Sequence, residues 1–356
     1  MKLFFTTDRQ TIIEAVTAKT VYFGLRDFKE KIVTGNCCFI CGARPEEKEF
    51  NDEHIIPNWV LRRYKLHDKQ INITPDRAVK YGGYVVPCCK ECNTQLGKLV
   101  EEPVNELLTK SYNEMAAAIR ADHNLFKLLY RWMCLLFFKT HLKDTYYPKE
   151  LDRRIDHGKL GDQYDWQRMH HIHCMCRVHY TEAVLDPEVY GSLVILPTLN
   201  FDVNKFDYMD HMLGKTAMVM LGDVCIIAVL DDSAIVTNMI DHVLAKITGP
   251  LTNFQLKEFF LRMAHTNIHI EPRPIFSSTI NANGEYAIEV QRPEECRIAE
   301  QQIITVGELL HFHAERFIAD DLPNREQILL EIKQGKRAYI LNEKGEFIQH
   351  KIDPAE

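Results

Sequence analysis

Apolar and polar positions in the first third of the chain predict two short strands followed by a helix. The strands are expected over residues 48–56 and 84–86, and the helix over residues 90–100, opening near Asn93 and ending before Pro103. Residues 125–138 are apolar except for Lys127 and Arg131, which lie one helical turn apart. This run is shorter than the ~20 residues that span a bilayer. It therefore predicts a buried helix, either between two domains or in a subunit interface.

The second half of the chain mixes strand and helix patterns. Residues 170–180 alternate, with His171, His173 and His179 on one face, as in a half-buried strand. Apolar runs over 218–221 and 224–230 flank Gly222 and predict a hairpin. Helices are expected over 234–247, 252–265, 306–317 and 324–334, and a terminal hairpin over 338–350. The fold class is therefore α+β.

Length and composition agree with a protein of more than one domain. The 356 residues favour two domains, and we expect a module over 1–110, a helical linker over 111–145 and a mixed α+β domain over 146–356. The eleven cysteines are odd in number, and the apolar start of the chain is too short for a signal peptide. We expect a reducing, cytoplasmic compartment and no membrane partner.

Paired cysteines are the strongest chemical signal. Cys38 and Cys41 form one Cys-x-x-Cys pair, and Cys89 and Cys92 form another, which is the spacing of a four-thiolate structural Zn²⁺ site. Each pair adjoins a further cysteine, Cys37 or Cys88, so a shift of one residue stays open. A saturated zinc site has no free position for chemistry, so any chemistry must lie beside it.

Between the pairs lie groups suited to that chemistry. Glu53 and His54 precede Pro57, and Asn93 follows the last cysteine of the second pair. A carboxylate, an imidazole and an amide next to a zinc-stabilised turn suit metal-assisted attack on a phosphodiester. The strand, strand, helix order is expected to bring His54 and Asn93 face to face.

These residues resemble the HNH endonuclease family, in the branch whose ββα-metal fold carries a structural zinc. The resemblance covers roughly residues 36–108 and does not extend to the C-terminal half. It implies that His54 is the general base, and that Glu53 and Asn93 bind a catalytic Mg²⁺ or Mn²⁺ through oxygen atoms. The sequence departs from the family where the middle Asn is expected, at Tyr84. Either Tyr84, a backbone carbonyl or Asn72 then orients the histidine, or catalysis is weakened.

Charge is divided unevenly along the chain. Residues 1–110 contain 17 Lys and Arg against 15 Asp and Glu, which is a net +2, whereas the whole chain carries −7 and the remainder therefore −9. Nucleic-acid affinity comes largely from cations that displace counterions. The candidates for a backbone-binding patch, which could equally be an ordinary solvated face, are Arg62, Arg63, Lys65, Lys90 and Lys98. Tight autonomous binding is not expected.

The C-terminal half shows no recognisable chemistry. Residues 213–216 resemble the end of a phosphate-binding loop, but Met209 stands where that loop needs glycine. The histidine face of residues 170–180 favours a solvated or interface strand over a second metal site. By elimination, this half is interpreted as a recognition, regulatory or assembly domain that contacts a protein partner or a second copy.

Two classes of function follow from the sequence. The first is a metal-dependent HNH endonuclease that hydrolyses nucleic acid, most readily DNA, with its C-terminal domain controlling access or recruiting a partner. Anti-phage defence is a context suggested by analogy alone. The second is a zinc-stabilised scaffold or nucleic-acid-binding protein whose degenerate head no longer cuts.

Overall fold

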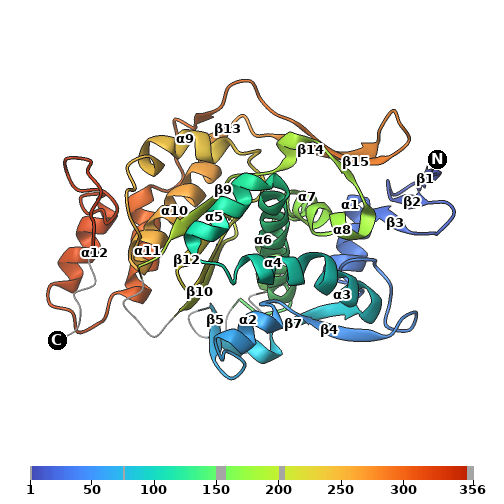
Figure 1. Ribbon diagram of the computed structural model, residues 1–356, viewed down its shortest axis with the longest axis horizontal. Helices are drawn as coiled ribbons and strands as arrows, with labels where there is room; N and C mark the ends of the chain where they lie inside the picture. The colour runs from blue at the N-terminus through green and yellow to red at the C-terminus, as the bar shows by residue number, and fades with distance from the viewer. Residues whose placement is uncertain (1, 75–76, 150–157, 200–204, 351–356) are drawn as a thin grey trace. The chain divides into compact units, whose positions relative to one another are not determined.

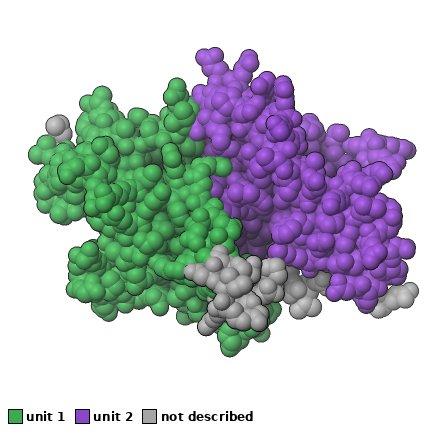
Figure 2. Space-filling model, turned by 180° about the vertical axis from the view of Figure 1, so that it is seen from behind, with its two compact units in different colours: residues 1–110, 118–189, 275–291 green, residues 111–117, 190–274, 292–356 purple. Residues whose placement is uncertain are grey.

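The chain folds into two compact units, each built from helices and sheets. The computed structural model describes residues 2–74, 77–149, 158–199 and 205–350 (Figure 1). Unit 1 comprises residues 1–110, 118–189 and 275–291, and unit 2 comprises 111–117, 190–274 and 292–356 (Figure 2, green and purple). The predicted α+β class is confirmed.

Unit 1 contains the predicted strand, strand, helix order. Strand β4 (Phe50–His54) pairs antiparallel with β7 (Val85–Cys89), with Phe50 opposite Cys89 and His54 opposite Val85. Helix α3 (Lys90–Leu96) begins directly after β7. The helix does not end before Pro103, because the chain continues through a π-helical turn, η3 (Gly97–Glu101), into α4 (Glu102–Leu107). Pro103 lies in the first turn of α4, where its missing N–H group is tolerated.

Short elements surround this core. The N-terminal sheet has the order β1 (Phe4–Thr6), β2 (Ile12–Glu14), β3 (Thr20–Tyr22), and is followed by α1 (Leu25–Asp27) and η1 (Phe28–Val33). Between β4 and β7 the chain forms α2 (Asn58–Arg63), a two-stranded sheet of β5 (Gln70–Thr74) and β6 (Arg77–Lys80), and the turn η2 (Tyr81–Gly83). These insertions follow the residue that ends β4, His54.

The predicted apolar helix forms and is longer than expected. Helix α6 (His123–Asp144) is capped by Asp122, whose side chain accepts a hydrogen bond from the Asn124 backbone N–H. It packs against α4, α7 and β7 within unit 1. The helix is therefore part of the unit that holds the cysteines and does not act as a separate linker. Within the described residues, no helix has the length and apolar content that crossing a membrane would require.

The prediction of a strand over residues 170–180 was wrong. The segment forms α7 (Trp166–Cys176) and α8 (Val178–Thr181), and Asp165 caps α7 by accepting from the backbone N–H groups of Gln167 and Arg168. Side chains from both faces of the expected strand are buried, including His173 and Met175 as well as Ile172. The alternation therefore did not follow exposure, because the buried histidines were counted as polar.

The chain returns to unit 1 after passing through unit 2. Strands β14 (Ile275–Ile280) and β15 (Tyr286–Gln291) form a sheet with β8 (Val184–Leu185), and α7 packs against β14. Helix α5 (Tyr112–Ala121) and the turns η4 (Leu160–Gln163) and η5 (Pro187–Val189) complete the connections. This division differs from the expected boundary near residue 146, because α6 and α7 pack on each other.

Unit 2 is built on a four-stranded antiparallel sheet. The order is β10 (Phe206–His211), β11 (Thr216–Leu221), β12 (Val224–Val229), β9 (Leu193–Pro197), and the hairpin at Gly222 is confirmed. Helix α10 (Asn253–His269) packs on β11 and β12, with α9 (Ile235–Leu244) and α11 (Val306–Phe317) beside it. Helix α12 (Arg325–Lys333) and the pair β13 (Ile270–Glu271) and β16 (Arg297–Ile298) complete the described elements.

All four helices predicted in this half are confirmed, within a few residues at each end. The terminal hairpin is much reduced. It consists of one isolated bridge between Leu341 and Phe347 and a hydrogen bond from the Ile348 N–H to the Ile340 carbonyl. The segment forms a turn closed by the backbone of Asn342 and Glu346.

Candidate functional site

Four cysteines converge in unit 1. The sulfur atoms of Cys38, Cys41, Cys89 and Cys92 all lie within 4.8 Å of one another, so the cluster could hold a metal ion. Among the residues that the structure describes, no other group of His, Cys, Asp and Glu side chains is arranged in this way. The cluster therefore contains the four cysteines that the spacing predicted, and Cys37 and Cys88 are buried beside it. Hydrogen bonds from Cys41, Cys88 and Cys92 lower the pKa of Cys38, which favours a thiolate at that sulfur.

Local geometry shapes the first cysteine turn. The Gly42 N–H donates to the Cys38 carbonyl at 2.8 Å, and the Cys38 N–H donates to the Ala43 carbonyl at 2.8 Å. Gly42 has φ +76°, a left-handed conformation in which other residues are strained. A Cβ atom at this position would also lie 2.6 Å from the Phe23 ring. The turn therefore favours glycine at position 42, directly after the second thiol, where the backbone is left-handed and passes close to Phe23.

Helix α7 and Arg177, the residue that directly follows it, hold this turn in place. The His173 Nε2 atom donates to the Phe39 carbonyl at 2.8 Å, and Arg177 donates to the carbonyls of Ile40, Val21 and Thr20. His173 and Arg177 are both fully buried. Burial lowers the pKa of His173 well below its usual value, so the ring is a neutral donor. Sequence reasoning missed both residues, because their partners lie more than a hundred positions away in the chain.

His54 lies at the end of β4 and is half-buried. Burial lowers its pKa, while the charge of Glu53 and, more weakly, a hydrogen bond with the Gly82 backbone oppose that shift. The His67 ring lies 6.5 Å from the His54 ring, and its Nε2 atom is 2.9 Å from the Asn58 Oδ1 atom. A neutral imidazole held by a backbone group can accept a proton.

Asn93 lies in the first turn of α3, directly after Cys92. Its Nδ2 atom is 3.5 Å from the Asp52 carbonyl oxygen, so the side chain faces β4 two residues before His54. Helix α3 packs on both β4 and β7. The ββα arrangement therefore brings Asn93 to the strand that carries His54, partly exposed to solvent.

Glu53 and Tyr84 have buried partners on α6. The Glu53 carboxylate accepts from the Lys139 ammonium at 2.6 Å, and the Tyr84 hydroxyl donates to Asp144 at 2.6 Å. The exposed fraction is 6 % for Glu53 and 1 % for Tyr84. The structure does not bring the Tyr84 hydroxyl to His54, because that hydroxyl joins β7 to α6. Asn72 lies on β5 and is exposed.

The predicted cationic patch is only partly available. All five side chains are exposed, but two of them are engaged within the protein. Arg63 donates to the Leu108 carbonyl at 2.9 Å and to the Asn105 side chain at 2.6 Å. Lys90 pairs with the exposed Glu49 carboxylate at 3.0 Å. Arg63 thus joins α2 to α4, and the charge of Lys90 is partly neutralised.

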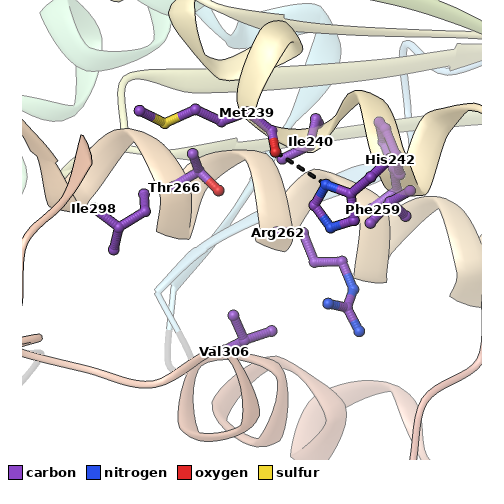
Figure 3. A pocket seen from close by; sticks show the side chains of 9 residues that line it. Met239, Ile240, His242, Phe259, Arg262, Thr266, Ile298 and Val306 are labelled. Atoms are coloured by element: carbon purple, nitrogen blue, oxygen red, sulfur yellow. Dashed lines mark hydrogen bonds between the residues drawn. The ribbon is translucent and has the colours of Figure 1, made fainter. Parts of the chain in front are cut away.

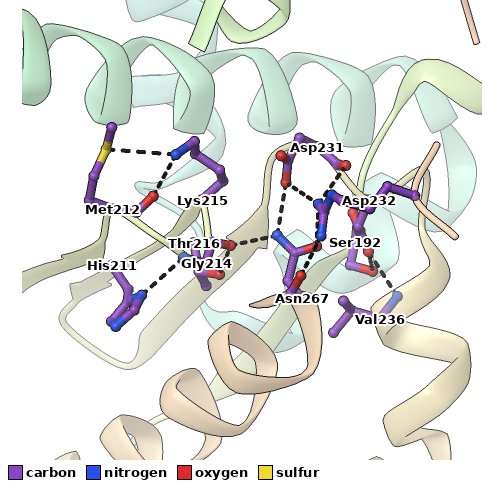
Figure 4. A network of polar contacts seen from close by, with 11 residues as sticks. Ser192, His211, Met212, Gly214, Lys215, Thr216, Asp231, Asp232, Val236 and Asn267 are labelled. Carbon is purple, nitrogen blue, oxygen red and sulfur yellow. Dashed lines mark hydrogen bonds and ion pairs between the residues drawn. The ribbon is translucent and has the colours of Figure 1, made fainter. Parts of the chain in front are cut away.

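Unit 2 contains a polar network whose groups serve the fold (Figure 4). Asp232 accepts from the Ser192 hydroxyl at 2.6 Å and from the Val236 N–H, in the first turn of α9, at 2.8 Å. Asn267 donates to the Gly214 carbonyl and to Asp231. Residues 213–216 lie in the turn between β10 and β11, and a strand follows them where a phosphate-binding loop would open a helix. The network joins strands and helices of one unit.

A cavity of about 180 Å³ lies between α9 and α10 in the same unit (Figure 3). Its walls are mostly apolar, and Arg262 and His242 are its cationic or titratable lining groups. Arg262 pairs with the buried Glu258 carboxylate at 2.8 Å, and His242 contacts the Met239 carbonyl at 3.1 Å. Both polar groups are engaged within the protein.

No model of a protein family, no curated protein and no solved structure matches this chain.

Proposed function

We propose that this protein is a metal-dependent endonuclease of the HNH type that hydrolyses phosphodiester bonds in nucleic acid, with DNA as the first substrate to test. The observation that carries the proposal is the convergence of β4, β7 and α3 on one point, with His54 at the end of β4 and Asn93 in the first turn of α3. The four cysteines lie beside this point and are proposed to hold a structural zinc ion.

The assigned roles follow from the chemistry of each group. His54 accepts the proton of the attacking water, and its lowered pKa keeps the imidazole in the required neutral form. The Asn93 amide oxygen and the Glu53 carboxylate are the oxygen ligands proposed for Mg²⁺ or Mn²⁺. That cation would neutralise charge that develops on the phosphate. The exposed cations Arg62, Lys65 and Lys98 would contact the nucleic-acid backbone.

The decisive experiment is a supercoiled-plasmid nicking assay with Mg²⁺, Mn²⁺ or a chelator. His54→Ala is expected to reduce cleavage by about a hundredfold or more, with zinc content and thermal stability near those of the wild type. Asn93→Ala should reduce cleavage in a way that excess Mn²⁺ partly restores. His123→Ala is a matched control, because it removes an exposed histidine of the same unit that stacks on Phe126.

A second function is favoured by one observation: the Tyr84 hydroxyl, at the position of the family's middle Asn, donates to Asp144 and not to His54. In this alternative the head is a zinc-stabilised nucleic-acid-binding protein that does not cut. It predicts plasmid binding without nicking in either metal, and equal behaviour of the wild type and His54→Ala. Cleavage by the wild type that is lost in His54→Ala excludes this alternative.

A further inference from the structure

One buried lysine contacts both residues at the centre of the proposed site. The Lys139 ammonium donates to the Glu53 Oε1 atom at 2.6 Å and to the His54 backbone carbonyl at 2.7 Å. It also lies 3.7 Å from the Glu101 carboxylate. Lys139 is on α6, far outside the segment that resembles an HNH module, and its side chain is 1 % exposed.

A buried ammonium group needs such partners. Transfer of an unpaired charge into a protein interior is strongly unfavourable, and lysines in such places usually lose their proton. Here the Glu53 carboxylate and the His54 carbonyl supply those partners, and the Glu101 carboxylate adds a nearby negative charge. The ammonium therefore stays charged. All three contacts lie on the side of α6 that packs toward β4 and η3.

The two main contacts act on different parts of the strand. Successive side chains of a β-strand point to opposite faces, so Glu53 and His54 project in different directions. Lys139 holds one of them by its side chain and the other by its backbone. One ammonium group thereby fixes both the Glu53 carboxylate and the peptide group from which the His54 side chain extends.

We propose that Lys139 is a positioning residue for the proposed nuclease, which holds Glu53 in the orientation needed to bind the catalytic cation and fixes the backbone of His54. The proposal rests on the proposed function. A carboxylate that binds a metal is typically hydrogen-bonded through another position to an outer partner, and loss of that partner weakens metal affinity or activity by about 10–100-fold. Lys139 is in the position of that partner, because it contacts one oxygen of Glu53.

The contact between Tyr84 and Asp144 offers a matched control. It is also buried, has the same length of 2.6 Å and joins α6 to the residue that directly precedes β7. Asp144→Ala removes it and leaves the Lys139 contacts in place. A purely structural role of α6 predicts that Lys139→Met and Asp144→Ala behave alike. A positioning role predicts that they differ in metal dependence.

The test measures Mn²⁺ binding by calorimetry and Mn²⁺-dependent plasmid nicking for the full-length wild type, Lys139→Met, Asp144→Ala, Glu53→Gln and the double variant Lys139→Met/Glu53→Gln. Lys139→Met is expected to weaken Mn²⁺ binding and to raise the Mn²⁺ concentration for half-maximal nicking, each by about 10–100-fold. Asp144→Ala should lower the melting temperature without changing either value. Because Lys139 acts on the metal through Glu53, the double variant should bind Mn²⁺ as Glu53→Gln does.

The outcomes separate this inference from the proposed function. If the wild type nicks DNA and Lys139→Met keeps wild-type Mn²⁺ binding, the positioning role is overturned and the nuclease assignment stands. If Lys139→Met and Asp144→Ala shift Mn²⁺ binding equally, the role is structural and the inference is also overturned. If the wild type does not nick but binds Mn²⁺ in a way that depends on Lys139, the metal site stands and the nuclease assignment fails. A wild type that neither nicks nor binds Mn²⁺ refutes both.

Discussion

Replacement of Arg177 by methionine tests how firmly α7 holds the first cysteine turn. Methionine has an unbranched, apolar side chain about as long as the aliphatic part of arginine, and it lacks the guanidinium. The wild-type group donates to the carbonyls of Ile40, Val21 and Thr20, and also lies 4.5 Å from the centre of the Phe23 ring. All of these partners belong to the first cysteine turn or to the N-terminal segment that packs beside it.

The expected loss of stability follows from what the variant leaves behind. Each buried carbonyl without a partner costs about 1–3 kcal/mol. Three such groups give an upper range of roughly 3–9 kcal/mol, which water entry and second partners reduce. We therefore expect the free energy of unfolding to fall by about 3–5 kcal/mol, similar to the removal of one partner from a buried ion pair. Proteins are typically stable by about 5–15 kcal/mol, so the variant should remain folded in the cold.

Tryptophan fluorescence during urea unfolding is suited to this measurement. The three tryptophans, Trp59, Trp132 and Trp166, all lie in unit 1. Metal release to a chromophoric chelator, measured in parallel, should become faster, because Ile40 lies between two of the cysteines. Arg26→Met is the control: Arg26 is exposed and pairs with Glu30 on the surface, where such a pair contributes about 0–1 kcal/mol. A loss below 1 kcal/mol in Arg177→Met, with metal release at the wild-type rate, would refute the reasoning.

Two further predictions concern the same unit. Protein purified without added metal should contain about one zinc per chain, and Cys92→Ser should lose the zinc and precipitate. The control Cys296→Ser alters a cysteine of unit 2 and should keep the zinc. Wild-type protein that is soluble, folded and free of zinc would contradict this prediction. Burial lowers the pKa of His170 to about 4, below the ordinary value of 6.5, so the unfolded chain binds the proton more readily. This contribution to stability is present above pH 6.5 and is lost as the pH falls toward 4, by about 2 kcal/mol between pH 6.5 and 5. Urea unfolding at these two pH values should show a smaller loss in His170→Gln, and an equal loss in both proteins would rule out His170 as the source.

Local patterns in the sequence were sufficient for a large part of the fold. The four clustered cysteines were predictable because the two-residue spacing within each pair determines which sulfurs can come together. The capped helices were also predictable: Thr252 and Thr305 each begin a helix with a reciprocal capping box, which is a signal within four residues.

The remaining features depend on contacts between distant residues. Lys139 contacts Glu53 across 86 positions, and His173 contacts Phe39 across 134. The sequence does not distinguish a buried histidine that donates to a carbonyl from a solvated one, and a strand was therefore predicted where α7 forms. In the same way, the sequence shows Lys139 only as a polar residue and does not indicate that its side chain is buried. Composition and periodicity carry no information about contacts between residues that lie so far apart in the chain.

The distance along the chain between the cysteine turn and α7 also has a consequence for biosynthesis. Phe39 and Ile40 are made 134 and 137 residues before the side chains that bind their carbonyls. At about 5–20 residues per second, translation of that interval takes roughly 7–27 s. During this time the nascent chain carries thiols without their final cover. Availability of zinc during synthesis, and chaperone protection of those thiols, would then influence the yield of native protein.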